Sequence, residues 1–241
     1  ISVLCPEMGM DSGFYIPTGH LISQNMPIEN AIKWVSDVLY EPDCTMVFAN
    51  AEYDLGWFRH YGIRYNGFTI EDVLIQAPLL DEHRFAWSLE SLSRLNGVSQ
   101  KNYDALIEEA LRVGVSEKSI MSNLRHMSAE AVGEYAVGDV IATYENFVVQ
   151  EQKMQEQDLT NIYDLERSLI PHMIEMRMKG VRIDIERAHK VAAHFKGLED
   201  NARQSLHDLS GIWVDSPWAA RELVPVLDIA GIKYPYTAKT N

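Results

Sequence analysis

The stretch from Thr45 to Ile63 constrains the fold of this chain more than any other. Met46 to Ala49 is a short apolar run, which is typical of a buried strand in a covered sheet. Asn50 follows, and apolar residues then recur at helical spacing until Gly62, a residue type that commonly ends helices. The stretch therefore predicts a buried strand that leads directly into a helix.

Asp54 lies on the first turn of that predicted helix, just beyond the end of the strand. Open α/β sheets place ligands at the carboxyl ends of their strands, so we expect a functional edge here. Asp72 follows a second short strand, Phe68 to Ile70, and could serve the same edge, although capping a helix is the more common role. Trp57 and Phe58 are expected in the core; an exposed aromatic ring near such an edge could instead hold a single strand of nucleic acid.

The first part of the chain mixes strands with helices. Ile1 to Met8 and Phe14 to Pro17 are strand-like and are separated by a glycine-rich turn, so they predict a hairpin. Pro27 to Leu39 has the apolar spacing of an amphipathic helix, and helical patterns prevail from Asp72 to Tyr144. This order predicts an α/β class domain, with one mixed sheet flanked by helices, over residues 1–152.

The later part of the chain, residues 153–241, predicts a helical unit. Gln150 to Asp158 is polar and fits either a linker or the solvated start of a helix. An apolar stripe then marks a long helix that ends at Gly180, and Asp184 is placed to cap the next helix. The stripe consists of Leu165, Leu169, Met173 and Met176, and a last helix is expected from Ser216-Pro217 to Gly231.

Composition narrows the class of protein. Apolar residues make up 46% of the chain and charged residues 23%, as in ordinary globular proteins. The formal net charge of −14 argues against a broad electrostatic grip on nucleic acid, although bound cations can supply local positive charge to a nuclease site. The sequence has no apolar run long enough to span a membrane, and Cys5 and Cys44 form no metal-ligand spacing, so we expect a cytoplasmic protein.

A second pair of residues has the same spacing as Asn50 and Asp54. Tyr135 and Asp139 are four residues apart in a helical segment and therefore share one face of it. Either spacing alone is weak, because a chain with this many aspartates holds roughly one such match by chance. From spacing alone, a surface aspartate beside a half-buried tyrosine is the more common explanation. The strand end before Asn50, the order of the two motifs and the helical segment of plausible length between them favour a site.

With these motifs in place, the chain resembles the proofreading 3′–5′ exonuclease domain of family A DNA polymerases, followed by the start of the polymerase thumb. NAEYD resembles the second exonuclease motif of that family and YAVGD the third, in its tyrosine form. Three further stretches carry the resemblance over nearly the whole chain: Glu71 to Val98, Leu165 to Asp184 and Ser216 to Pro235.

The resemblance implies a ribonuclease H-like fold and a site for two divalent cations, Mg²⁺ or Mn²⁺, in the complete enzyme. Asp54 and Asp139 would be metal ligands, and the Tyr135 hydroxyl would orient the attacking water. Asn50 would touch the substrate or fix the strand end. The implied partner is DNA with a single-stranded 3′ end, in a bacterial or phage-infected cell, and replication proteins are possible partners.

The chain departs from the family at the first motif, an Asp-x-Glu on the central strand, which should lie just before the hairpin. Asp164 to Glu166 and Asp184 to Glu186 have this spacing, but both fall downstream on predicted helices or helix starts. We therefore expect a fragment without its central first strand, with weak metal binding and negligible exonuclease activity by itself. The hairpin should then either close onto the Met46 strand or leave the domain marginally stable.

Two alternatives stay open. One is a stand-alone 3′–5′ exonuclease that trims RNA with the same set of motifs; the thumb-like stretch from Gly180 to Pro235 argues against it. The other is a degenerate exonuclease domain that only binds DNA for an attached polymerase. An Asp-x-Glu strand upstream would favour activity over this silent form.

Overall fold

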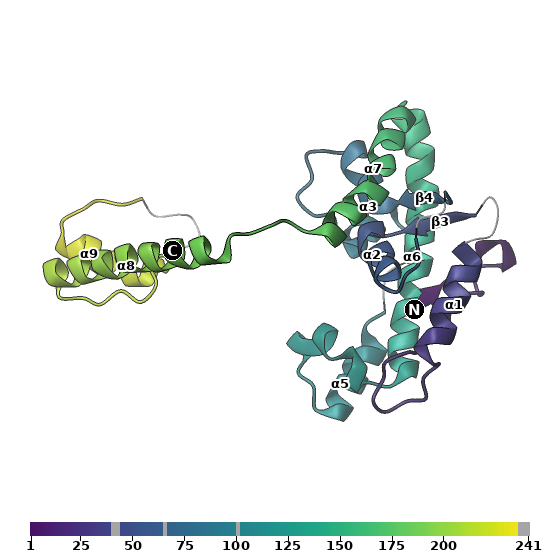
Figure 1. Cartoon of the computed structure of the whole chain (residues 1–241), viewed down its shortest axis with the longest axis horizontal. Coiled ribbons are helices and arrows are strands. Elements are labelled where there is room, and N and C mark those ends of the chain that lie inside the picture. Colours follow the sequence, from purple (N-terminus) through teal and green to yellow (C-terminus); the bar gives the residue numbers. More distant parts are fainter. Residues whose placement is uncertain (40–43, 65–66, 100–101, 236–241) are drawn as a thin grey trace. The chain divides into compact units, whose positions relative to one another are not determined.

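The computed structural model describes residues 1–39, 44–64, 67–99 and 102–235. The chain divides into two compact units, Ile1–Gly180 and Val181–Asn241, which are described separately below (Figure 1). The boundary expected at residues 152/153 falls inside helix α6 (Ala129–Glu156), whereas the contacts within the chain divide it after Gly180. Gln150 to Asp158 is the end of a helix and the turn after it, so it is neither a linker nor the start of a helix.

The strands of the first unit form two separate small sheets in the part of the chain that the structure describes. β1 (Ser2–Val3) pairs antiparallel with β2 (Phe14–Tyr15), so the predicted hairpin is confirmed. β3 (Thr45–Phe48) pairs parallel with β4 (Thr69–Asp72), with Thr45 opposite Thr69. The expectation of one mixed sheet is wrong for these residues, and the hairpin does not close onto β3.

Helix α6 explains why the two sheets can lie apart. It contacts β1, β2 and β3, so both sheets pack on the same helix. Figure 1 shows α6 running the length of the first unit. Gly133 allows the close approach of the hairpin, because a Cβ atom at this position would lie 3.2 Å from the Tyr15 ring.

The remaining helices of the first unit follow the predicted pattern closely. Ser88 and Gly97 cap α4 at its two ends, and serine and glycine are residue types that commonly occupy these positions. The helices are α1 (Ile28–Leu39), α2 (Ala51–His60), α3 (Val73–Leu80), α4 (Leu89–Asn96), α5 (Asp104–Val113), α6 and α7 (Thr160–Lys179), with short 3₁₀ turns at Pro6–Met8, Glu117–Ser122 and Leu124–His126.

Helix α7 buries a different face from the one we expected. The predicted stripe of Leu165, Leu169, Met173 and Met176 is exposed. Tyr163, Ile170 and Ile174 are buried instead, on the side of α7 that contacts α2, α3 and β4. Both sets of residues have helical spacing, so periodicity alone could not decide which of the two apolar faces meets the core.

The second unit contains α8 (Ile185–Ser210) and α9 (Ala220–Ile229). The side chain of Asp184 caps α8 by accepting a hydrogen bond from the backbone N–H of Arg187 at 2.9 Å, as predicted. The predicted start of α9 at Ser216-Pro217 is wrong by several residues. Glu222 accepts hydrogen bonds from the backbone N–H groups of Asp215 and Ser216, each at 2.8 Å, which hold these residues in a turn before the helix. Over the described residues, no helix combines the length and apolar character needed to span a membrane.

Candidate functional site

The parallel pairing of β3 and β4 brings Asn50 and Asp72 to the same edge of their sheet, because Phe48 lies opposite Asp72. Asn50 has a left-handed backbone, with φ 79° and ψ 62°, which asparagine adopts more readily than most residues. Its side chain makes no capping hydrogen bond to α2. The asparagine at this position is therefore explained in part by the tight turn from β3 into α2.

Asp72 organises this edge of the sheet. Its side chain is 2% exposed, and its carboxylate accepts a hydrogen bond from the backbone N–H of Ala51 at 2.6 Å and from that of Leu74 at 2.8 Å. The backbone N–H of Asn50 donates a third hydrogen bond at 3.2 Å. One carboxylate thus holds the starts of both α2 and α3, and the role of Asp72 as a helix cap is confirmed.

Asp54 lies one turn into α2, next to the carboxylate of Asp72. The pKa of Asp54 is raised to about 6, mainly by burial and also by the negative charge of Asp72, while the ammonium group of Ile1 acts in the opposite direction. Two carboxylates in a partly desolvated place disfavour each other's charge. A cation bound there would relieve this repulsion, so the electrostatics of Asp54 suit a metal ligand.

Hydrogen bonds and ion pairs hold helix α7 against the same edge of the sheet. The spacing of residues in the sequence does not predict these contacts. The hydroxyl of Tyr163 accepts a hydrogen bond from the backbone N–H of Asp72 at 2.8 Å and donates one to the Glu71 carboxylate at 2.7 Å. Arg167 pairs with Glu71 and also with Asp164, the latter at 2.8 Å. Tyr163 lies 91 residues beyond Asp72, and no local pattern joins residues so far apart.

Tyr135 and Asp139 form a second cluster, on α6. Tyr135 is buried, and its ring lies 5.2 Å from that of Tyr103, measured between centroids. Burial raises the pKa of the Tyr135 phenol, and the negative charge of Asp139 and a hydrogen bond with Tyr103 raise it further. The phenol therefore stays protonated at neutral pH and can donate a hydrogen bond, which suits orienting a water molecule rather than acting as a base.

The predicted site residues thus belong to two clusters, Asn50 and Asp54 beside Asp72, and Tyr135 beside Asp139. Carboxylate oxygens suit hard divalent cations such as Mg²⁺ and Mn²⁺. Within residues 1–39, 44–64, 67–99 and 102–235, however, no three potential ligands from His, Cys, Asp and Glu come together. The described residues therefore do not make a full ligand set for a metal ion.

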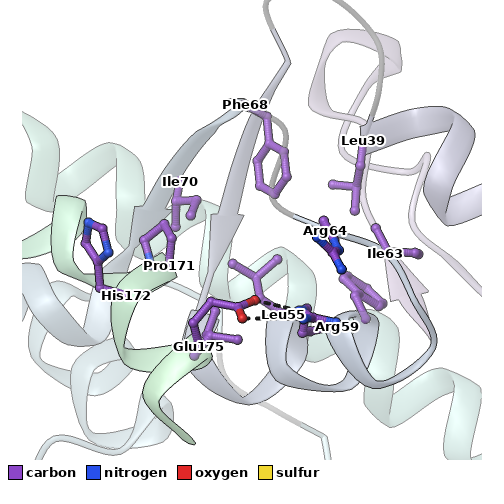
Figure 2. A pocket seen from close by; sticks show the side chains of 12 residues that line it. Leu39, Leu55, Arg59, Ile63, Arg64, Phe68, Ile70, Pro171, His172 and Glu175 are labelled. Carbon is purple, nitrogen blue, oxygen red and sulfur yellow. Dashed lines mark hydrogen bonds and ion pairs between the residues drawn. The ribbon is translucent and has the colours of Figure 1, made fainter. Parts of the chain in front are cut away.

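A separate pocket lies between α2, β4 and α7, with a volume of about 290 Å³ (Figure 2). Its lining is mostly apolar, and Arg59 at its edge pairs with Glu175 at 2.5 Å. None of the predicted site residues lines this pocket. Leu39 and Arg64 in its wall adjoin segments outside the described residues, and nothing in the lining identifies a ligand.

Comparison with known proteins defines the class of protein to which this fold and these clusters belong. A family model described as 3′–5′ exonuclease matches residues 7–157, which include Asp54, Tyr135 and Asp139. This match covers more than half of the chain. The chain therefore belongs to the 3′–5′ exonuclease domain family of family A DNA polymerases, and the resemblance seen in its motifs is confirmed.

Its relatives are polymerases. The chain is 30% identical over 227 residues to a protein named DNA polymerase DpoZ from Acinetobacter phage SH-Ab 15497, a match that covers 89% of this chain and 36% of that protein. It is 28% identical over 230 residues to a DNA-directed DNA polymerase of Pseudomonas phage M6, covering 94% of this chain and 34% of the relative. DNA polymerase I of Rhizobium leguminosarum is 23% identical over 168 residues, covering 69% of this chain and 16% of the relative. The chain spans about a third of the length of the phage relatives.

Proposed function

We propose that this chain is the proofreading region of a DNA polymerase and that it removes nucleotides from the 3′ end of DNA by hydrolysis of the phosphodiester bond. The observation that carries the proposal is the match to the exonuclease family over a range that includes Asp54, Tyr135 and Asp139. The partners are DNA with a single-stranded 3′ end and the polymerase part of the same protein. The helical unit Val181–Asn241 is the start of the polymerase thumb.

In this proposal each site residue has one task. Asp54 and Asp139 would contribute carboxylate ligands for two divalent cations in the complete enzyme; the chemistry that such cations would supply is activation of a bound water and stabilisation of charge on the phosphate. The protonated hydroxyl of Tyr135 donates a hydrogen bond that orients the attacking water. Asn50 contacts the substrate from the turn between β3 and α2. The raised pKa of Asp54 supports its assignment, because a carboxylate crowded by a second one favours a bound cation.

The test is an exonuclease assay on the polymerase that contains this chain. We expect Asp54→Asn and Asp139→Asn each to lower the release of the 3′-terminal nucleotide from a single-stranded oligonucleotide by at least about 100-fold, with nucleotide addition unchanged. Asp184→Asn, in the capping residue of α8, is the matched control and should leave the exonuclease rate unchanged. Unchanged exonuclease activity in both site variants would refute the proposed roles.

The same assay separates the remaining alternatives. A degenerate domain would bind the oligonucleotide but release no nucleotide, and a stand-alone RNA-trimming enzyme would prefer an RNA oligonucleotide. The 241-residue chain by itself is expected to show negligible activity and weak Mn²⁺ binding. Titration of the chain with Mn²⁺, followed by calorimetry, checks this without relying on turnover.

A further inference from the structure

The outer face of α2 carries a run of exposed aromatic rings. Trp57 was expected in the core, but it is 49% exposed, and Tyr53 and Tyr61 are 54% and 46% exposed. Neighbouring rings meet edge to face: the centroid of Trp57 lies 6.4 Å from that of Tyr53 and 5.9 Å from that of His60. His60 and Tyr61 are 5.3 Å apart in the same way. We call these four residues the aromatic strip.

The strip is a consequence of helical spacing. Tyr53, Trp57 and Tyr61 are four residues apart, so they stack along one side of α2, while Ala51 and Leu55 point into the core on another side. Eight residues of helix span about 12 Å. The edge-to-face contacts limit the rotation of each ring, so the strip presents a partly pre-ordered surface rather than four independent side chains.

The strip is continuous with the proposed exonuclease site. Tyr53 directly precedes Asp54, so the strip begins one residue from Asp54 on α2 and extends away from it along the helix. A cation flanks the same helix: the guanidinium of Arg177 donates a hydrogen bond to the carbonyl oxygen of Glu52 at 3.5 Å and would lie 3.4 Å from a Cβ atom at Gly56. A negatively charged backbone running along the strip would therefore pass near a positive charge.

We propose that Trp57 and Tyr61, supported by His60, form a stacking platform for unpaired bases of single-stranded DNA that lie beyond the 3′-terminal nucleotide. The inference rests on the proposed function, which supplies a single-stranded substrate with its 3′ end at Asp54. It extends that function by assigning a second contact region, which bears on affinity for longer strands and not on the hydrolysis itself.

Stacking of aromatic rings on bases is an interaction with nucleic acid that an acidic chain can make. The net charge of −14 leaves little long-range attraction for phosphates, whereas every base has a π-face that an aromatic side chain can contact regardless of sequence. A platform of this type tolerates any sequence at the 3′ end. This is what a single-stranded substrate of arbitrary sequence requires.

The test compares two oligonucleotides of different length, labelled at the 5′ end, by fluorescence anisotropy of the 241-residue chain at one fixed, low salt concentration. The dinucleotide dT2 reaches only the 3′-end site, and dT12 is long enough to cover the strip. We expect Trp57→Ala and Tyr61→Ala each to weaken binding of dT12 by about 5- to 100-fold and to change binding of dT2 by less than about 2-fold. Trp57→Phe keeps an aromatic face and should restore most of the affinity.

Trp218→Ala is the matched control, since Trp218 is also a highly exposed tryptophan but lies in the second unit. It should leave binding of both oligonucleotides unchanged. Because the strip residues are about half exposed, the variants should fold, which circular dichroism checks. Equal binding of dT12 by the unmodified chain and both alanine variants would overturn the proposal. An equal loss for dT2 and dT12, or no binding of dT12 by the unmodified chain, would overturn it too.

Asp54→Asn distinguishes this proposal from the exonuclease assignment. If the variant binds dT12 normally and the polymerase carrying it no longer releases nucleotides, both proposals stand. If nucleotide release survives Asp54→Asn while Trp57→Ala still weakens dT12 binding selectively, the catalytic role of Asp54 fails and the platform stands.

Discussion

Asp72 in the first unit and Asp184 in the second have the same local role in very different surroundings. Both are aspartates at the N-cap of a helix, and each side chain accepts a hydrogen bond from a backbone N–H two or three residues later. Asp72 is buried and also accepts hydrogen bonds from the first residues of α2. Asp184 is exposed, and its capping bond serves α8 alone.

The difference shows that the same capping residue can contribute very differently to stability, depending on its surroundings. The cap at Asp184 competes with water at the surface, whereas the cap at Asp72 replaces water at the junction of two strands and two helices. The buried cap also affects Asp54, which is one of the proposed site residues. Asp54 lies beside the buried cap, where the charge of Asp72 and burial oppose its own ionisation. The buried edge therefore contains one carboxylate that stabilises the fold and one that the fold disfavours.

Removal of the buried cap should have the largest effect. We expect Asp72→Ala to lower the free energy of unfolding of the first unit by about 3 kcal/mol or more, because it leaves buried N–H groups of Asn50, Ala51 and Leu74 without their acceptor. Urea unfolding followed by circular dichroism measures it. Asp72→Asn keeps one acceptor oxygen and should lose less. A loss below about 1 kcal/mol for the alanine variant would show that burial adds little to this cap.

Asp54→Asn should act in the opposite direction. The pKa of Asp54 is about 6 in the folded chain and near 4 when unfolded, so the folded state binds the proton more tightly between these values. The carboxylate therefore costs no stability below about pH 4; its cost grows between about pH 4 and 6 and stays constant above that range. We expect Asp54→Asn to stabilise the chain at pH 7 by at most about 3 kcal/mol, and not at all at pH 4.

Urea unfolding of the variant and the unmodified chain at both pH values checks this prediction. Glu71 and Asp72 also have raised pKa values, but they are present in both proteins, so the difference between the two isolates Asp54. A variant that is less stable than the unmodified chain at pH 7 would show that Asp54 supports the fold instead of straining it.

The order of the elements and the caps could be predicted from the sequence, because these depend on residues close together in the chain. The β3–α2 unit, the hairpin and the caps at Asp72, Ser88 and Asp184 are all local signals. The pairing of Tyr163 with Glu71 and Asp72 could not be predicted, since it depends on how α7 packs on β4. The exposure of Trp57 and of the Met173 face of α7 was missed for the same reason: spacing identifies a face but not its neighbour.

A smaller effect should follow from the long-range support of the buried cap. Tyr163→Phe keeps the ring but removes the hydroxyl that accepts from the backbone N–H of Asp72 and donates to Glu71. We expect a loss of about 1–2 kcal/mol in the free energy of unfolding, measured in urea. Tyr234→Phe, whose hydroxyl bonds to Asp228 at the surface of the second unit, is the matched control and should change stability by less than about 0.5 kcal/mol. Equal losses of stability in the two variants would contradict the claim that the buried hydroxyl of Tyr163 contributes more to stability than the hydroxyl of Tyr234.

The exposed cap should give the smallest of these effects. Asp184→Ala removes the acceptor for the backbone N–H of Arg187 and the negative charge at the start of α8, for which we expect a loss of about 0.5–1 kcal/mol. Hydrogen exchange of the first-turn amides of α8 measures it locally, where global unfolding of the first unit does not interfere. Asp184→Ser keeps a capping oxygen without the charge and should retain most of the protection. A loss at Asp184 as large as that at Asp72 would mean that the cap itself, rather than its burial at a junction of two helices, determines the energy.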